Sequence, residues 1–172
     1  MDPLLVITNS DAGSADEEAL DRALGVLRGQ TSVEVAATGG PGELDGVLHR
    51  AGSRRIVVAG GDGSLHAVVA ALHRRNELAG RVLGLVPLGT GNDFARTLEI
   101  PLDPEEAARV VLEGREAPID LIVDEVGEVV VNNVHVGAGA EAGRVAERWK
   151  SRFGRVGYPI GALITAWRPP VL

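Results

Sequence analysis

Short apolar runs alternate with amphipathic stretches along the first two thirds of the chain. Four runs rich in Val, Leu, Ile and Ala predict buried strands at residues 4–10, 32–38, 54–60 and 81–89. The amphipathic stretches predict helices at residues 14–29, 41–51, 63–75, 92–98 and 104–114. Because strands that alternate with helices are joined by right-handed crossovers, the pattern predicts an α/β fold with a doubly wound parallel sheet.

Two of these helices carry signals for their first residues. Ser14 followed by Glu17 predicts a capping box at the start of the first helix. Asp103 followed by Pro104 predicts a capped start for the last helix.

The pattern changes after Gly114. Two strand-like runs between residues 118 and 137 flank the turn sequence "EVGE", which predicts an antiparallel hairpin. We therefore expect an α/β domain at residues 1–116 and the incomplete start of a second, β-rich domain at residues 117–172. Apolar residues of this second part are expected to lack partners, namely Val129, Val131, Ile160, Leu163 and Trp167.

Composition narrows the classes of function. Apolar residues make up 45% of the chain and aromatic residues 3%, so the core must be largely aliphatic. The chain has no cysteine, which excludes disulfides and thiolate chemistry. A net charge of −7 argues against a nucleic-acid partner. No apolar run is long enough to span a membrane, so a cytoplasmic protein is expected.

Basic residues gather between Arg144 and Arg155. This cluster could bring the protein to anionic lipids at the inner membrane surface, as a peripheral contact. A solvated helix face is the alternative interpretation.

A glycine-rich sequence, "GGDGS" (Gly60–Ser64), lies between the third strand and its helix. Glycines at such a turn let backbone N–H groups approach an anion closely, which predicts a phosphate site. Asp62 should repel a phosphate there by about 4 kcal/mol at about 4 Å and an effective dielectric constant near 20. A bridging magnesium ion or an arginine would remove that repulsion, whereas the alternative makes Asp62 a simple helix cap.

A second glycine-rich sequence, "GTGNDFAR" (Gly89–Arg96), follows the fourth strand. Gly89 frees the backbone, Thr90 offers a hydroxyl, and Asn92 with Asp93 opens a short helix. Ligands of open α/β sheets bind at the carboxyl edge, so both loops are expected to contribute to one site.

The two sequences "GGDGS" and "GTGNDFAR", in this order and spacing, resemble the diacylglycerol kinase catalytic domain family of bacterial lipid kinases, sphingosine kinases and ceramide kinase. The resemblance implies an NAD kinase/diacylglycerol kinase-like, Rossmann-like fold that binds ATP and Mg²⁺. It also implies a phosphate loop at Asn9, Ser10 and Gly13 and a nucleotide contact at Thr38. His66 stands where asparagine is usual in the family, and Gly139 stands where sphingosine kinases have an aspartate near the lipid.

Asp62 is expected to be both a catalytic residue and the magnesium ligand. The candidate nucleotide-binding residues are Asn9, Ser10, Gly13, Thr38, Gly60, Gly61, Asp62, Gly63, Ser64, His66, Gly89, Thr90, Asn92 and Asp93.

The implied function is an ATP-dependent lipid kinase that transfers the γ-phosphoryl group to a lipid alcohol such as diacylglycerol. The family's general base is expected well beyond Leu172, so this chain should hold mainly the nucleotide-binding part. An NAD kinase-like enzyme and a non-catalytic nucleotide-binding module are the alternatives. Unpaired strand edges in the incomplete second domain also predict association into a homo-oligomer.

Overall fold

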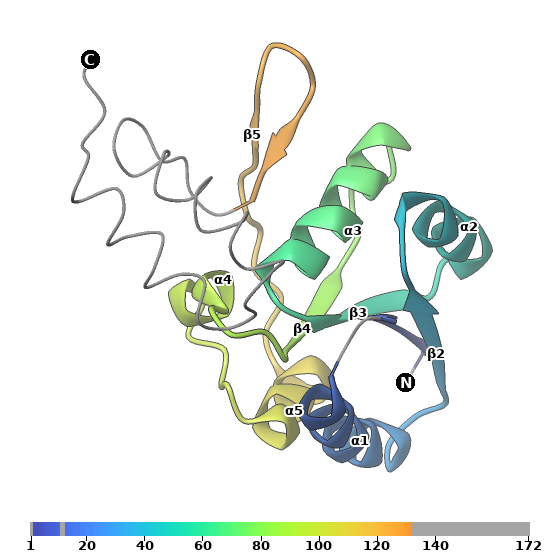
Figure 1. Ribbon diagram of the computed structural model, residues 1–172, viewed down its shortest axis with the longest axis vertical. Helices are drawn as coiled ribbons and strands as arrows, with labels where there is room; N and C mark the ends of the chain where they lie inside the picture. Colours follow the sequence, from blue (N-terminus) through green and yellow to red (C-terminus); the bar gives the residue numbers. More distant parts are fainter. Residues whose placement is uncertain (1, 11–12, 132–172) are drawn as a thin grey trace. The chain divides into compact units, whose positions relative to one another are not determined.

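A parallel sheet of four strands forms the centre of the molecule. The computed structural model describes residues 2–10 and 13–131. Within these residues the strand order is β2-β1-β3-β4, and every neighbouring pair in this sheet is parallel (Figure 1). The strands are β1 (Leu4–Asn9), β2 (Val33–Thr38), β3 (Arg55–Gly60) and β4 (Leu83–Pro87). The predicted α/β class and parallel sheet are confirmed.

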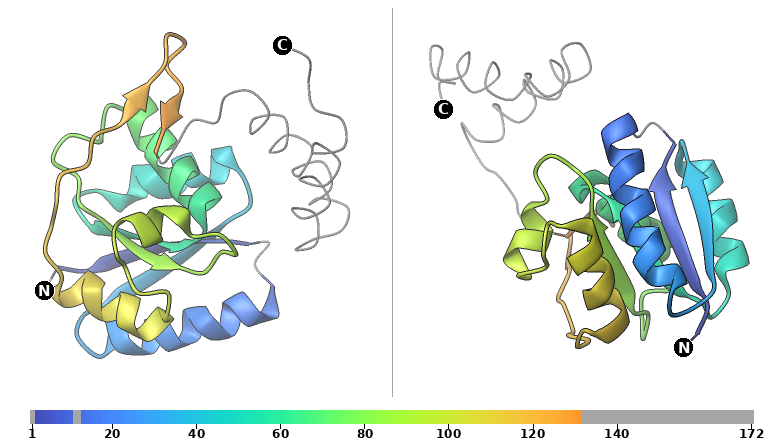
Figure 2. Two further views of the ribbon diagram at one scale, coloured as in Figure 1. Left: turned by 90° about the vertical axis from the view of Figure 1, so that its left-hand side faces the viewer. Right: turned by 90° about the horizontal axis from the view of Figure 1, so that it is seen from below.

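Helices cover both faces of this sheet. Helices α1 and α5 pack together on one face, and α2 and α3 cover the other (Figures 1 and 2). The short helix α4 follows the loop after β4. The helices are α1 (Ser14–Arg28), α2 (Pro41–Ala51), α3 (Asp62–Arg74), α4 (Asp93–Thr97) and α5 (Pro104–Glu113).

Side chains of the central strands alternate between two apolar cores. In β1, Leu5 and Ile7 pack with α2 and α3, whereas Leu4 and Val6 pack with α1 and α5. The same alternation occurs in β3, since successive side chains of a strand point to opposite faces. Two covered faces explain why these strands are almost wholly apolar in sequence.

The two helix starts differ in how well the sequence predicted them. The prediction of Ser14 as N-cap is wrong, because α1 begins at Ser14 and Gly13 occupies the N-cap position. At α5 the prediction is confirmed: Asp103 Oδ1 accepts hydrogen bonds of 3.0 Å from the N–H groups of Glu105 and Glu106.

The predicted hairpin is present. Strands β5 (Ile122–Val123) and β6 (Val129–Val130) pair in antiparallel fashion. The Asp124 carboxylate accepts hydrogen bonds from the N–H groups of Val126 and Glu128 and so holds the turn. Gly127 has a φ of +86°, a conformation that glycine adopts without strain.

One prediction about this hairpin is wrong. Val129 is buried, with 3% of its surface exposed, in the core that contains α2 and α3, and Val131 packs against the same core. The hairpin therefore packs on the α/β domain, and these two residues have partners. Ile160, Leu163, Trp167, Gly139 and the basic cluster lie outside the described residues, and the domain boundary after residue 116 stays a prediction.

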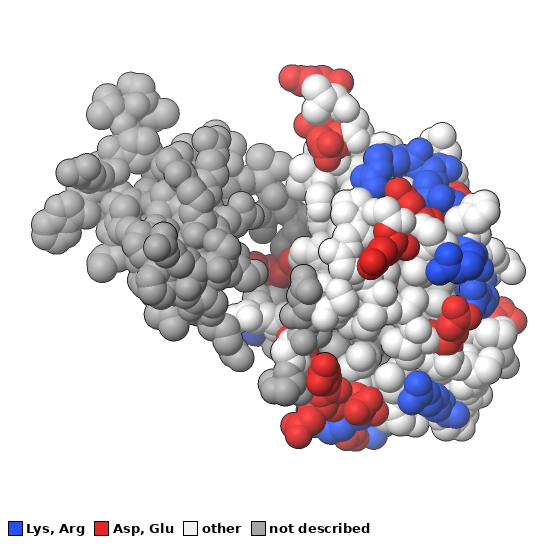
Figure 3. Space-filling model, turned by 45° about the vertical axis from the view of Figure 1, so that its right-hand side comes forward, with Lys and Arg blue, Asp and Glu red and all other residues white. Residues whose placement is uncertain are grey.

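Charged side chains of both signs are interspersed on the face shown in Figure 3. Several arginines form ion pairs: Arg54 with Glu34, and Arg75 and Arg81 with Glu77. The hydrogen bond from Arg75 lowers the pKa of Glu77 below its ordinary value.

In the part of the chain that the structure describes, no helix is long and apolar enough to cross a bilayer.

Candidate nucleotide-binding site

The four predicted loops begin at one edge of the sheet. Asn9, the last residue of β1, is in register with Thr38 of β2, and Gly60 of β3 is in register with Pro87 of β4. The chain leaves β1 towards β2 and leaves β3 towards β4, in the opposite direction. Open α/β sheets bind ligands at this kind of switch point, outside the carboxyl ends of the strands.

The loops after β1 and β2 contact each other. The Ser10 N–H donates to the carbonyl of Thr38 over 3.2 Å, and the Thr38 hydroxyl donates to the carbonyl of Thr8 over 3.4 Å. The Gly39 N–H donates to the Glu43 carboxylate over 2.7 Å. The structure thus brings Asn9, Ser10 and Thr38 together at the edge.

The two glycine-rich loops touch through their backbones. The Leu88 N–H donates to the carbonyl of Gly60 over 3.1 Å. A Cβ added to Gly89 would lie 2.5 Å from the Cα of Gly61, closer than real Cβ atoms come. Glycine is therefore required at this contact, whatever else the loops bind.

Asn92 holds the second loop in shape. Its φ is +55°, a left-handed conformation, and its side chain is buried. Its Oδ1 accepts from the Gly89 N–H over 3.0 Å, and its Nδ2 donates to the Gly89 carbonyl over 2.7 Å. The sequence predicts that Asn92 binds nucleotide, which stays a prediction, and it did not reveal this internal role.

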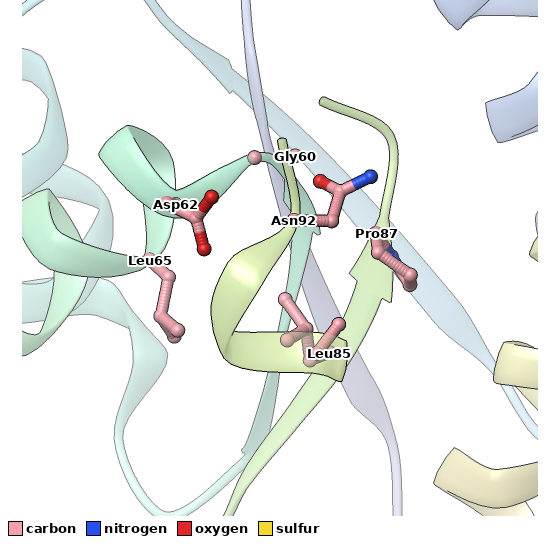
Figure 4. Close-up of a pocket in the computed structure, with 8 residues that line it drawn as sticks. Gly60, Asp62, Leu65, Leu85, Pro87 and Asn92 are labelled. Carbon is pink, nitrogen blue, oxygen red and sulfur yellow. The ribbon is translucent and has the colours of Figure 1, made fainter. Parts of the chain in front are cut away.

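The Asp62 carboxylate faces the second loop. Its Oδ2 accepts from the Asp93 N–H and its Oδ1 from the Phe94 N–H, both over 3.0 Å (Figure 4). The interpretation of Asp62 as the cap of its own helix is wrong, because Gly61 is the N-cap of α3 and the Asp62 carboxylate accepts from the first two N–H groups of α4. Two backbone donors at a helix start explain how a carboxylate is tolerated between glycines.

Gly13 is the N-cap of α1, and the other predicted residues lie in the second glycine-rich loop and at the starts of α3 and α4. Ser64 packs close to Gly60, since a Cβ on Gly60 would meet Ser64 Oγ at 2.6 Å. Gly63, Thr90 and Asp93 are exposed at the edge.

His66 contacts the hairpin. Its Nε2 lies 2.9 Å from the carbonyl oxygen of Val129, so this nitrogen donates to β6. No feature of the sequence around His66 indicated this contact, which spans 63 positions along the chain.

The space between the two loops is small. The hollow among eight residues, including Gly61, Leu65 and Asn92, has a volume of about 0 Å³ open to a molecule the size of water (Figure 4). This volume is too small to enclose a nucleotide, so a nucleotide would lie across the loops. Residues 2–10 and 13–131 contain no group of three or more His, Cys, Asp or Glu side chains that could hold a metal ion.

Comparison with known proteins supplies the family. The family model described as diacylglycerol kinase catalytic domain matches residues 3–123. A protein of Cronobacter sakazakii named "Probable lipid kinase YegS-like" is 35% identical over 156 residues, which cover 88% of this chain and 52% of that protein. A protein of the same name from Serratia proteamaculans is 34% identical over 167 residues, covering 94% and 54%.

A solved structure agrees with the fold. The crystal structure of a diacylglycerol kinase from Bacillus anthracis matches with a TM-score of 0.67 and 25% identity, covering 87% of this chain and 54% of that one. The chain thus spans about half the length of these relatives. With a family match over most of its length and both glycine-rich loops at one sheet edge, the chain belongs to the diacylglycerol kinase catalytic domain family.

Proposed function

We propose that the chain forms the ATP-binding part of a lipid kinase that phosphorylates a lipid alcohol such as diacylglycerol. The observation that carries the proposal is the contact between the two glycine-rich loops at the carboxyl edge of the sheet. Backbone N–H groups at such an edge suit phosphate oxygens. The names of the relatives support a lipid as the acceptor.

In the proposed reaction the lipid hydroxyl oxygen attacks the γ-phosphorus of ATP. A new P–O bond forms, the bond from the γ-phosphorus to the bridging oxygen breaks, and ADP leaves. The hydroxyl proton passes to a general base. Catalysis of this kind depends mainly on positioning and on charge stabilisation, which the loops would supply.

Magnesium is proposed to enter with ATP, bound to the phosphates. Mg²⁺ in kinases is commonly held by one or two carboxylates together with substrate phosphates. That Asp62 itself binds the ion stays a prediction, and the two hydrogen bonds to its carboxylate favour a different role.

The two alternatives, an NAD kinase-like enzyme and a non-catalytic nucleotide-binding module, differ from the proposed lipid kinase in whether phosphate is transferred and to which acceptor. The family match favours a lipid over NAD as the acceptor. A non-catalytic module would bind ATP without transferring phosphate. We expect this chain to bind ATP and to transfer little phosphate by itself, because the sequence resemblance leads us to expect the general base beyond Leu172.

Calorimetry with ATP, in the presence and absence of Mg²⁺, tests the proposal. We expect measurable binding that Mg²⁺ strengthens. Transfer is measured separately as γ-³²P that enters the lipid phase with diacylglycerol. A folded sample that shows no heat with ATP would contradict the proposed function.

Gly63 and Gly25 provide a test variant of the site and a matched control. A Cβ at Gly63 meets no atom within 4 Å apart from its chain neighbours and the backbone of its own helix, and the same is true of Gly25 in α1. Gly63→Ala should therefore fold normally but weaken ATP binding about tenfold, about 1.4 kcal/mol, because the methyl group keeps a phosphate away from the backbone. Gly25→Ala should leave binding unchanged.

A further inference from the structure

The Asp62 carboxylate connects two helix starts that are far apart in sequence. Asp62 is the first residue of α3, and its two hydrogen-bond donors, Asp93 and Phe94, are the first two residues of α4. Figure 4 shows the carboxylate turned towards the start of α4. Asp62 Oδ2 is also close to Gly91, since a Cβ on Gly91 would meet it at 3.3 Å.

These hydrogen bonds satisfy donors that the helix itself cannot satisfy. The first N–H groups of a helix have no partner within it, and α4 has only five residues. A negative carboxylate at this end is also stabilised by the helix dipole. The start of α4 therefore depends on a side chain from another loop.

The second loop is held to the first at three points. The Leu88 N–H bonds to Gly60, Gly89 touches Gly61, and Asp62 binds the start of α4. Asn92 connects these points, because its side chain closes the loop from Gly89 to α4. Without Asp62 the loop would be held to its neighbour at one end only.

We propose that Asp62 is a positioning residue that holds the second glycine-rich loop in its phosphate-binding shape, and that it is not the magnesium ligand. The inference rests on the proposed function in one respect, that the loop binds a nucleotide. The hydrogen bonds from Asp93 and Phe94 turn both carboxylate oxygens towards α4, and among the described residues no two further acidic or histidine side chains join Asp62 in a group that could hold a metal ion.

The two roles of Asp62 differ in their dependence on magnesium. A positioning residue supports ATP binding equally with Mg²⁺ and with EDTA. A magnesium ligand supports only the part of the affinity that Mg²⁺ adds. Asp62→Asn distinguishes them, because the amide keeps one acceptor oxygen and places an NH₂ group against a backbone N–H.

We expect Asp62→Asn to weaken ATP binding about 10- to 100-fold, the effect of losing one charged hydrogen bond, and to do so equally with Mg²⁺ and with EDTA. In the nucleotide-free protein, amide exchange at Asp93 and Phe94, followed by NMR, should accelerate by a similar factor. Unchanged exchange at these amides, or a loss of affinity confined to samples with Mg²⁺, would overturn the inference.

Asp103→Ala is the control for loss of a helix cap, because asparagine would keep the one oxygen, Oδ1, that accepts both hydrogen bonds. Asp103 also accepts hydrogen bonds from two N–H groups at a helix start, in α5. Its substitution should accelerate exchange at Glu105 and Glu106 and leave ATP affinity unchanged. An equal loss of ATP affinity in this variant would assign the effect of Asp62→Asn to general destabilisation and overturn the inference.

A second variant and the amide-exchange measurement keep the inference about Asp62 testable if Asp62→Asn does not fold or if the chain binds no ATP. Should Asp62→Asn fail to fold, Asp62→Ser is measured in the same way, because its hydroxyl accepts from one amide without a charge. If the unmodified chain binds no ATP, the proposed function fails, whereas exchange at Asp93 and Phe94 still decides whether Asp62 holds the loop.

Discussion

Gly89 is the residue at which the two glycine-rich loops tolerate least change. An added Cβ would also lie 2.9 Å from Asn92 Oδ1, so the methyl group of alanine would push against both Gly61 and the closing amide. We expect Gly89→Ala to lower the free energy of unfolding by about 1–3 kcal/mol, the cost of overpacking. Urea denaturation measures it.

Gly25→Ala is the control for this measurement. Its Cβ has open space on α1, and alanine is a better helix former than glycine. The variant should gain about 0.4–1 kcal/mol of stability. Equal stability of Gly89→Ala and the unmodified protein would show that the loops can separate at no cost.

For single residues, the sequence predicted where the candidate site residues lie but not what they contact. Asp62 and Asn92 were both identified from the glycine-rich patterns. The partners of Asp62 lie 31 and 32 positions further along the chain, and the left-handed backbone of Asn92 has no periodic signature. Such contacts depend on how two loops meet in space, which local propensity does not encode.

At the scale of helices and strands, a hydrogen bond from His66 connects helix α3 to strand β6 of the hairpin. The bond from His66 to the Val129 carbonyl is accompanied by burial of Val129 in the core. We expect His66→Ala to accelerate amide exchange in β6 about 2- to 10-fold, in line with the loss of one neutral hydrogen bond. Hydrogen exchange followed by NMR measures it.

His73→Ala serves as the comparison for that variant. His73 lies near the other end of α3, away from the contact of His66 with β6. Exchange in β6 should not change in this variant. If both histidine variants accelerate it equally, the contact of His66 does not hold the hairpin.

The elements themselves were predictable because their periodicity is local. The apolar runs became β1 to β4, and the amphipathic stretches became the five helices. The predicted bounds of an element are wrong where contacts between distant parts of the chain determine its end. The predicted strand at residues 81–89 is shorter, Leu83–Pro87, because Leu88 and Gly89 belong to the loop that meets β3.

For the whole molecule, the position of each strand in the sheet should set its stability. Strands β1 and β3 are central and paired on both sides, whereas β2 is paired on one side among the described residues. We expect amides of β1 and β3 to exchange only on global unfolding, and amides of β2 to exchange faster through local opening. Mass spectrometry at two protein concentrations measures both rates.

The concentration series also tests the predicted homo-oligomer. If the chain associates through residues 117–172, as predicted, protection in that part should rise with protein concentration. Protection of β2 equal to that of β1 in a dilute monomer would contradict the argument from strand position.

The alternation of β1 between two cores limits how its gene segment can change length. Losing one codon within Leu4–Ile7 would exchange the side chains that face α2 and α3 with those that face α1 and α5. It would also draw Asn9 back from the edge where the loops gather. Point substitutions among aliphatic residues should therefore accumulate in this segment, while single-residue deletions should be eliminated by selection.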